Sequence, residues 1–478
     1  MRSSEFVLVG SGMAALVAAA RLLEHGHRVL VLERTDRPGG YFGGFRNEAG
    51  DRFDLAVSHL LGAGPGGPFR KVLELLGLGG RIELRPVELA DVVTLRGHRI
   101  ELPSGLDRLQ RSLSAQFPGS AGQLERFIGF LREFLGEGDD ERERGRFLLR
   151  NRLRGFQEFC TETIDDPLLR NALAMRIQCD DSALLIMAGF LAECYGRGMT
   201  VPIGGVHALV EAMAGGIRRA GGRIRYGCEV RELRVEGDRA TGVVLADGTV
   251  HPADVVLFNG DGPALRRQLR ERGLPEPEQR GRCGHSSLSV FHTLAGAELS
   301  RFGAAARHYL SETEDVFESY RVLERGRTPE HPVIKLHLPS RLDRTLAAPG
   351  RELVRIEVDT YHDPAVHTPA FYRDYARRIE RTLARSLLPE LATHSVYRRV
   401  LTPCDFQARF GHTGGSATGW AHDVDNYMRR RMSQRTSLGN VLITGQWGEH
   451  GSGLPQLIAS AERSVALAEH WLRGRERG

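Results

Sequence analysis

The 478-residue sequence predicts an α/β protein in which a nucleotide-binding domain with a parallel sheet is interleaved with a mixed α+β domain. Three observations predict this class. A buried strand runs into a glycine-rich turn and a helix at residues 6–25, and the same arrangement returns at residues 441–461. Residues 106–198 have the apolar periodicity of helices, whereas short runs within residues 288–358 alternate like strands. We therefore expect the two distant glycine-rich turns to be halves of one nucleotide pocket.

The first turn, Gly10-x-Gly12-x-x-Ala15, has the dinucleotide-binding fingerprint with alanine in third place. Gly10 permits the tight turn, Gly12 lets the backbone approach the pyrophosphate, and Ala15 permits close packing of helix on strand. The helix N-terminus then presents free N–H groups to the anion. Glu33 closes the second strand, where a carboxylate accepts hydrogen bonds from a ribose diol. Because these parts occur in the right order, they predict a dinucleotide rather than a chance loop.

The fingerprint alone fits either NAD or FAD. Arg34 follows the acid directly, and Gly39 and Gly40 come a few residues later. A second glycine pair at this place offers bare backbone where the diphosphate of a long cofactor passes. The pair therefore favours FAD.

Four segments carry a resemblance to a known family. They are residues 6–40, Phe53-Asp54 with the small-residue loop after it, residues 202–256 and residues 445–461. In this order they resemble the flavin-dependent phytoene desaturase and carotenoid isomerase family, which is more distantly similar to the flavin amine oxidases. The resemblance covers most of the chain but is specific only in the parts that would bind FAD.

The resemblance implies a Rossmann-like FAD-binding domain of the glutathione reductase type. Residues 1–80, 201–280 and 396–478 would form it, and residues 81–200 and 281–395 would form a substrate-binding domain with a helical cap. The backbone near Val230 would hold the adenine. The final turn would hold the ribityl chain and flavin ring through Gly445, Gln446, Gly453 and Leu454. Gln446 stands where family members often carry aspartate.

By resemblance, the expected activity is hydride transfer between flavin and an elongated apolar substrate, such as a polyene, an isoprenoid or a polyketide-derived chain in secondary metabolism. Oxidation of C–C to C=C is favoured, with redox-neutral isomerisation and reductive cyclisation on reduced flavin as alternatives. An amine or amino-acid oxidase is a further alternative, although the expected strand at residues 286–294 lacks the lysine that such enzymes often use, and Lys335 lies on the next strand. The last alternative is a protein that binds and escorts a lipid or polyene and in which FAD has a structural role only.

A flavin performs hydride chemistry itself, so the protein must position the substrate and move protons. His450 with Glu449, at the start of the last helix, is the main candidate pair, because histidine carries protons near neutral pH and a carboxylate can orient its ring. The pair could equally satisfy helix-start N–H groups without reacting. His59 and His412 are further candidates, for which a structural role is favoured.

The composition is that of a soluble globular protein, with 41% hydrophobic and 26% charged residues. No stretch approaches the ~20 apolar residues of a membrane span, and no signal peptide precedes the first strand, which predicts a cytoplasmic location. The six cysteines form no C-x-x-C pair, so we expect free thiols and no metal site.

The net charge of +5 is carried almost entirely by arginine. Arginines cluster at residues 142–154, 377–378 and 429–431. These clusters are typical of solvated helix faces, with contact to a membrane surface or an acidic substrate as the alternative. No binding motif accompanies the charge, so nucleic acid is not an expected partner. The sequence does not predict an oligomeric state.

Overall fold

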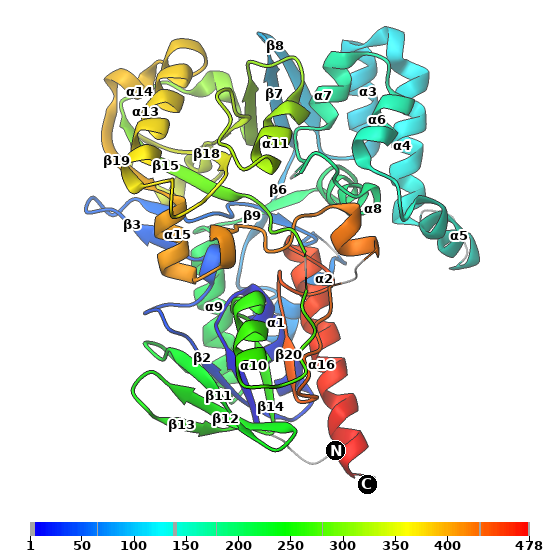
Figure 1. Ribbon diagram of the computed structural model, residues 1–478. Coiled ribbons are helices and arrows are strands. Elements are labelled where there is room, and N and C mark those ends of the chain that lie inside the picture. The colour runs from blue at the N-terminus through cyan, green and yellow to red at the C-terminus, as the bar shows by residue number, and fades with distance from the viewer. Residues whose placement is uncertain are drawn as a thin grey trace.

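The computed structural model describes residues 5–64, 66–136, 141–177, 179–279, 281–429 and 432–476. Two sheets organise the molecule, a five-stranded parallel sheet and a seven-stranded mixed sheet (Figure 1). Residues 430 and 431 of the predicted arginine cluster lie outside the described residues. Within the described ranges, no helix combines the length and apolarity that a membrane crossing requires.

The parallel sheet brings the two ends of the chain together. Its order is β10 (Arg223–Arg225), β2 (Arg28–Leu32), β1 (Glu5–Val9), β14 (Val255–Phe258) and β20 (Val441–Ile443). The β1 and β2 runs are almost wholly apolar because both faces of a parallel sheet are buried. Strand β14 pairs with both β1 and β20, so the two glycine-rich turns emerge at one edge, where the strand order reverses. The predicted interleaving is confirmed.

Helices cover one face of this sheet and a small meander covers the other. The helical face packs α1 (Met13–Glu24), α2 (Pro68–Leu75), α9 (Val206–Arg219) and α16 (Leu454–Glu476). The opposite face carries α10 (Gly262–Glu271) and a three-stranded sheet. That sheet consists of β11 (Val230–Glu236), β12 (Arg239–Leu245) and β13 (Val250–Pro252).

The seven-stranded sheet lies above the nucleotide-binding part (Figure 1). Its order is β19 (Ser395–Leu401), β15 (Ser286–Ala295), β18 (Arg351–Thr360), β17 (Ile334–His337), β16 (Ala305–Ser311), β7 (Leu89–Leu95) and β8 (His98–Pro103). The sequence pattern predicts β15, β17 and β18 but not β7, β8 or β16. The predicted boundary at residues 395/396 falls at the start of β19, which pairs with β15. We propose that the substrate-binding domain includes β19.

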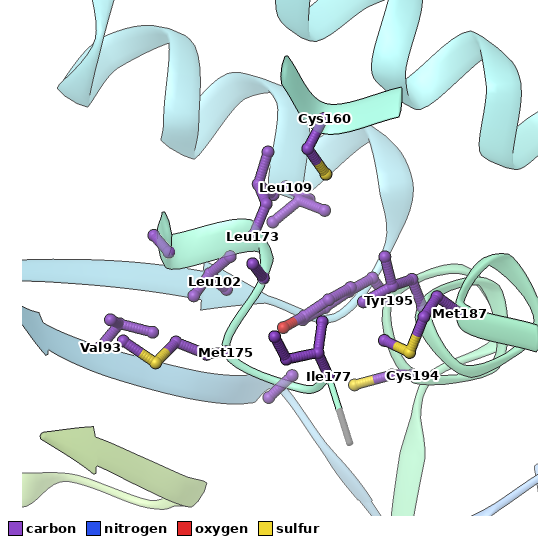
Figure 2. Packing of buried hydrophobic residues seen from close by; sticks show 14 of the residues in the cluster. Val93, Leu102, Leu109, Cys160, Leu173, Met175, Ile177, Met187, Cys194 and Tyr195 are labelled. Atoms are coloured by element: carbon purple, nitrogen blue, oxygen red, sulfur yellow. The ribbon is translucent and has the colours of Figure 1, made fainter. Parts of the chain in front are cut away.

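The helical cap packs against one end of this sheet. It comprises α3 (Leu106–Gln116), α4 (Ala121–Leu135), α5 (Glu141–Asn151), α6 (Phe156–Thr163), α7 (Pro167–Leu173) and α8 (Leu184–Leu191). Its core is continuous with the sheet, as Figure 2 shows for Val93 and Leu102 beside Leu109, Leu173 and Tyr195. A π-helical turn (Ala192–Arg197) then returns the chain to the nucleotide-binding part.

The remaining elements are short or cover sheet faces. The helices are α11 (Val316–Glu324), α12 (Pro339–Leu342), α13 (Pro369–Ser386), α14 (Glu390–Thr393) and α15 (Pro403–Phe410). The strands are β3 (Gly44–Arg46), β4 (Arg52–Asp54), β5 (Leu60–Leu61), β6 (Leu84–Val87) and β9 (Met199–Pro202). Single turns of 3₁₀ or π helix occupy Gly40–Phe42, Pro118–Ser120, Ser300–Phe302, Arg344–Leu346, Thr413–Gly415 and Asp425–Arg429.

Candidate active site

Both glycine-rich turns line one cavity at the carboxyl ends of β1, β2, β14 and β20. Gly10 and Gly12 lie on one side, and Gln446 and Trp447 lie on the other. The second glycine pair, Gly39 and Gly40, closes against the first turn through a bridge between Gly12 and Gly39. The cavity therefore has bare backbone along one wall, which suits a pyrophosphate that must approach the N-terminus of α1.

Asn259, immediately after β14, ties the two turns together. Its backbone N–H donates to the Val9 carbonyl at 2.8 Å, and its side-chain Nδ2 donates to the Thr444 carbonyl at 3.0 Å. A Cβ on Gly12 would lie 2.5 Å from Asn259 Oδ1, and one on Gly445 would come within 3.0 Å of Nδ2. Glycine is thus required at both positions by one amide wedged between them. The sequence reasoning missed this residue.

Glu33 points into the adenylate end of the cavity. Its Oε2 accepts from the backbone N–H and the hydroxyl of Ser11 at 2.8 and 2.7 Å, and its Oε1 accepts from the same two groups of Thr35. The backbone from Cys228 to Val230 forms the facing wall, and the Cys228 N–H donates to the Glu33 carbonyl at 2.8 Å. A carboxylate beside an exposed backbone segment fits the ribose and adenine of FAD.

Arg34 closes the same end from the outside. Its guanidinium donates to the Arg409 carbonyl of α15 and lies 3.7 Å from Glu229. It therefore links the end of β2 to a segment that follows the seven-stranded sheet. Ala15 is fully buried within α1, consistent with the packing role that the fingerprint gives it.

The other end of the cavity is aromatic and amide-lined. Tyr41, Gln446, His412 and Trp447 line it. Gln446 Nε2 lies 3.0 Å from His412 Nδ1, and the His412 ring meets Trp447 edge-on at 5.9 Å between centroids. Burial lowers the pKa of His412, so its neutral ring faces the position that a flavin would occupy. The residues at both ends of the cavity thus fit FAD.

Gly453 and Leu454 form the entry to α16. Gly453 has φ +109°, and a Cβ there would lie 2.7 Å from the Phe190 ring, so only glycine allows this approach between the cap and the turn. Leu454 is buried against the helical face of the parallel sheet. Neither residue lines the nucleotide cavity as the structure defines it.

Glu449 and His450 lie in the turn before α16, which begins at Leu454, and no hydrogen bond or ion pair joins them among the described residues. Glu449 Oε1 lies 3.1 Å from Arg463 Nε, and both side chains are partly exposed. The His450 Nδ1 is buried and has no hydrogen-bond partner among the described residues. Burial lowers the pKa of His450. Neither residue is part of the nucleotide cavity wall, so their catalytic role remains a prediction.

His59 lies in the loop between β4 and β5, beneath the seven-stranded sheet. Its ring is 6.3 Å from that of His337 on β17, and its Nδ1 has no partner in the described part of the chain. Burial and the nearby guanidinium of Arg307 hold the pKa of His59 well below its usual value. The structure therefore places a neutral histidine ring between the seven-stranded sheet and the loop that leads into β5. Its role also remains a prediction.

Lys335 is held by carboxylates on the adjacent strand. Its Nζ lies 2.7 Å from both oxygens of Asp359 and 3.3 Å from Glu357 Oε1. This buried ammonium has its charge already balanced. Its donors thus point at carboxylates of the sheet, and Lys335 does not line the nucleotide cavity, so it does not supply the lysine that amine oxidases often use.

A second cavity, of about 260 Å³, lies behind the segment that carries His412. His285 and Tyr320 line it, and both contact Asp359, at 2.9 and 3.1 Å. Gly414 lines this cavity while His412 lines the other, so the segment separates the two.

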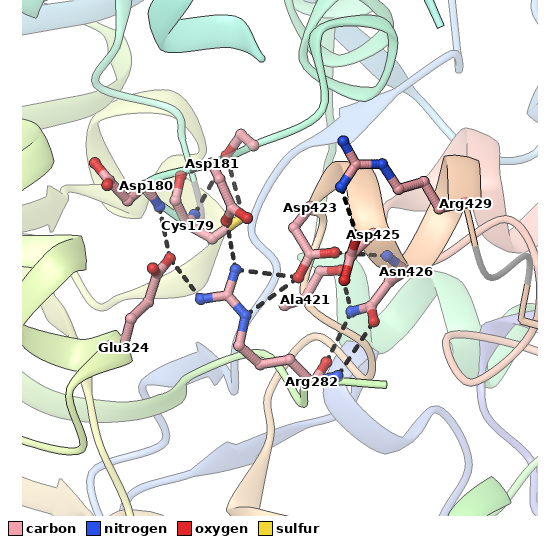
Figure 3. Close-up of polar contacts among 11 residues, drawn as sticks. Cys179, Asp180, Asp181, Arg282, Glu324, Ala421, Asp423, Asp425, Asn426 and Arg429 are labelled. Atoms are coloured by element: carbon pink, nitrogen blue, oxygen red, sulfur yellow. Dashed lines mark hydrogen bonds and ion pairs between the residues drawn. The ribbon is translucent and has the colours of Figure 1, made fainter. Parts of the chain in front are cut away.

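Arg282 closes one side of the second cavity. Its guanidinium contacts the carboxylates of Asp181, Glu324 and Asp423, from the cap, α11 and the loop before the last turn (Figure 3). Asp181, Glu324 and Cys179 lie close enough together to hold a cation, but these two carboxylates bond to the arginine. The six cysteines are free, as expected.

Comparison with known proteins shows which proteins this chain is similar to. The family model described as flavin containing amine oxidoreductase matches residues 13–294. The chain is 26% identical to 4,4'-diapolycopene oxygenase of Methylomonas sp, over 95% of this chain and 96% of that protein. It is 26% identical to the zeta-carotene-forming phytoene desaturase of Myxococcus xanthus, over 97% and 94%. Among solved structures, an oxidoreductase from Methanosarcina mazei superposes with a TM-score of 0.65 at 16% identity, over 97% of this chain and 100% of that one.

Proposed function

This chain belongs to the flavin containing amine oxidoreductase family and is an FAD-dependent oxidoreductase, and we propose that its substrate is an elongated apolar polyene or isoprenoid chain. The observation that carries the proposal is the match over nearly the whole length to carotenoid desaturases and an oxygenase, cap included. Desaturation is the leading reaction, and a double-bond isomerisation or a reductive cyclisation is the alternative. A cytoplasmic location remains a prediction from the sequence.

In this proposal, bound FAD would accept the hydride. The protein side chains would position the cofactor and substrate and would move the accompanying proton. The bare backbone at Gly12 and the N-terminus of α1 would face the diphosphate, and Glu33 would accept hydrogen bonds from the ribose. Gln446, which contacts His412, would face the ribityl chain and offer it a neutral donor in place of aspartate. His450 takes or returns the proton that accompanies the hydride.

The experiment is anaerobic mixing of the FAD-loaded protein with a panel of carotenoid precursors while the flavin absorbance is followed. A desaturase bleaches the flavin with one equivalent of oxidised polyene. An isomerase acts only after prior reduction and returns the flavin unchanged. Bleaching by amines with hydrogen peroxide release in air, and none by polyenes, would contradict the proposal in favour of an amine oxidase.

Replacing His450 by alanine is expected to lower turnover about 100-fold or more, since general acid–base groups contribute 10²–10⁴. The pKa of His450 is below its usual 6.5, so the ring is neutral and able to accept a proton at pH 7. The wild-type rate should therefore fall only at pH values under that pKa, and the variant should lose this acid limb. Single-turnover kinetics across pH check this in protein with full FAD. His470→Ala, an exposed histidine of α16, is the control. A turnover within a few-fold of wild type would remove His450 from the mechanism.

We propose that α5 makes a peripheral contact with the membrane that stores such substrates. Leu149 near the end of α5 and Leu153 just after it are 63% and 50% exposed, among arginines of the predicted 142–154 cluster. Exposed apolar side chains flanked by cations suit the surface of an anionic bilayer. Leu149→Glu should reduce cosedimentation with phosphatidylglycerol vesicles several-fold, whereas Val396→Glu, an equally exposed apolar site on β19, should not.

A further inference from the structure

The seven-stranded sheet has two buried faces of opposite character. Val290, Val354 and Ile356 point to one face, where Tyr375 and Ile379 of α13 cover them. Successive side chains of a strand point to opposite faces, so the alternate positions lie on the other side of the sheet. That side faces the loop between β4 and β5, which carries Ser58 and His59.

The second face is ionic, although it is buried. We define the ionic face as the following side chains: Asp91, Arg307, Tyr309, Lys335, His337, Arg355, Glu357 and Asp359. Strand register places Arg355 opposite His337, Arg307 opposite Asp91, and Lys335 opposite both Tyr309 and Glu357. The charged side chains therefore adjoin one another across four strands. A binding site for a pure hydrocarbon would not need these side chains, because buried charge is costly.

The carboxylates of the ionic face are already committed. Asp91 accepts two hydrogen bonds of 2.7 Å from Arg176 of the cap, in a bidentate pair. Asp359 holds Lys335 and His285. Glu357 lies 3.3 Å from both Lys335 Nζ and Arg355.

Two guanidinium groups remain incompletely satisfied. Arg307 Nη1 donates to the Tyr309 hydroxyl at 2.8 Å, its Nε has no acceptor, and no ion pair joins it within the described part of the chain. Arg355 Nη2 lies 3.0 Å from His337 Nε2, but the Nε and Nη1 of this 2%-exposed side chain have no acceptor among the described residues. Burial lowers the pKa of Arg355, and the nearby charge of Arg307 lowers it as well.

These arginines lie close to the loop that leads into β5, and the second glycine-rich turn lies on the other side of that loop. His337 Nδ1 lies 3.4 Å from Ser58 Oγ, so the ionic face contacts the loop that leads into β5. Gly62, just after β5, faces Pro455 at the start of α16, and a Cβ on it would be 3.5 Å from the proline ring. The ionic face and the second glycine-rich turn therefore lie on the two sides of one loop.

We propose that Arg307 and Arg355 bind a carboxylate of the substrate, which makes that substrate an acid with an apolar polyene body. The apolar polyene body of the substrate is inferred from the proposed function, whereas its carboxylate is inferred from the ionic face alone. A carboxylate supplies the acceptors that the two guanidinium groups lack, and its planar geometry matches their fork. A neutral hydrocarbon would leave these buried donors unpaired.

The test compares all-trans-retinoic acid with all-trans-retinol, two polyenes that differ in the carboxylate, on the FAD-loaded protein. Binding is followed by perturbation of the flavin absorbance. The acid should bind about 10- to 100-fold more tightly, as expected for charged hydrogen bonds. Arg355→Gln and Arg307→Gln should each remove most of this preference. Arg351→Gln is the matched control, because Arg351 lies on the same strand but pairs with Asp51 at 3.3 Å.

Each outcome bears on a different claim. Equal affinity of the wild type for acid and alcohol, or a preference kept by both arginine variants, overturns the carboxylate site and leaves the polyene function standing. If neither retinoid binds, benzoate and benzamide replace them. An Arg307-dependent preference for benzoate then supports the carboxylate site and contradicts the polyene body, whereas no preference overturns the site as well. If the Arg355 variant fails to retain FAD, the Arg307 variant alone is compared with the wild type, because Arg307 is less buried than Arg355.

Discussion

Replacing Gly445 by alanine is expected to raise the Kd for FAD about 30-fold or more. The residue has φ +95°, which costs an L side chain about 1–3 kcal/mol. The new Cβ would also clash with Asn259 Nδ2, and overpacking of this kind adds about 1–3 kcal/mol. Relief requires the turn to move away from the cavity, so about 2 kcal/mol of the cost should appear in FAD affinity. Titration of the apoprotein with FAD measures it.

Gly221→Ala separates the two causes. Gly221 has nearly the same φ, +92°, but a Cβ there would meet nothing within 4 Å. It should therefore lower stability by the backbone strain alone and leave the Kd for FAD unchanged. Equal FAD affinity in Gly445→Ala and Gly221→Ala would contradict the role of Gly445 and Asn259 in shaping the cofactor cavity.

Glu276→Gln is expected to lower the free energy of unfolding by about 3–5 kcal/mol, because it leaves the buried charge of Arg266 uncompensated. Arg266 is 1% and Glu276 4% exposed, and the two side chains form a direct ion pair. Arg266 also donates to the Ser433 carbonyl at 2.6 Å, and Glu276 accepts from the Ser437 N–H at 2.5 Å. The pair thus anchors the segment that leads into β20. Thermal unfolding with the FAD fluorescence as a second probe should show both transitions shifted down.

Glu232→Gln is the surface counterpart of this variant. Glu232 pairs with Arg272 at the end of the same helix, α10, but both side chains are a third or more exposed. Exposed pairs contribute about 0–1 kcal/mol, so the unfolding temperature should hardly change. A loss in Glu276→Gln as small as that in Glu232→Gln would show that the buried pair does not hold β20 in place.

The parallel sheet was predictable because its signals are local. An apolar run ending in Gly10-x-Gly12, or in Gly445, specifies a buried strand, a tight turn and a helix within about 20 residues. Asn259 was not predictable, since one asparagine after an apolar strand looks like any loop residue. Only the pairing of β14 with both β1 and β20 makes it the wedge between the turns.

The ionic face illustrates a different limit. Arg307, Arg355 and Glu357 alternate with apolar residues, and such polar positions usually face water on an antiparallel sheet. The sequence does not show that a second layer covers them. Likewise, the adjacency of Glu449 and His450 suggested joint action, yet both residues lie in the turn before α16, which begins at Leu454, and Glu449 contacts Arg463 instead.

The separation of the two glycine-rich turns has a consequence for how the protein is made. Chains emerge from the ribosome N-terminal end first, so the fingerprint at Gly10 exists long before Gly445 does. Until then α1 lacks α16, whose Glu462 and Glu469 contact Arg21 and His25. The apolar residues of α1 that pack against α16 consequently lack that partner in the nascent chain, and the part of the cavity formed by Gln446 and Trp447 is missing. Flavin loading is therefore a late step of biogenesis, and it acts on a protein whose substrate-binding sheet and cap have already been synthesised.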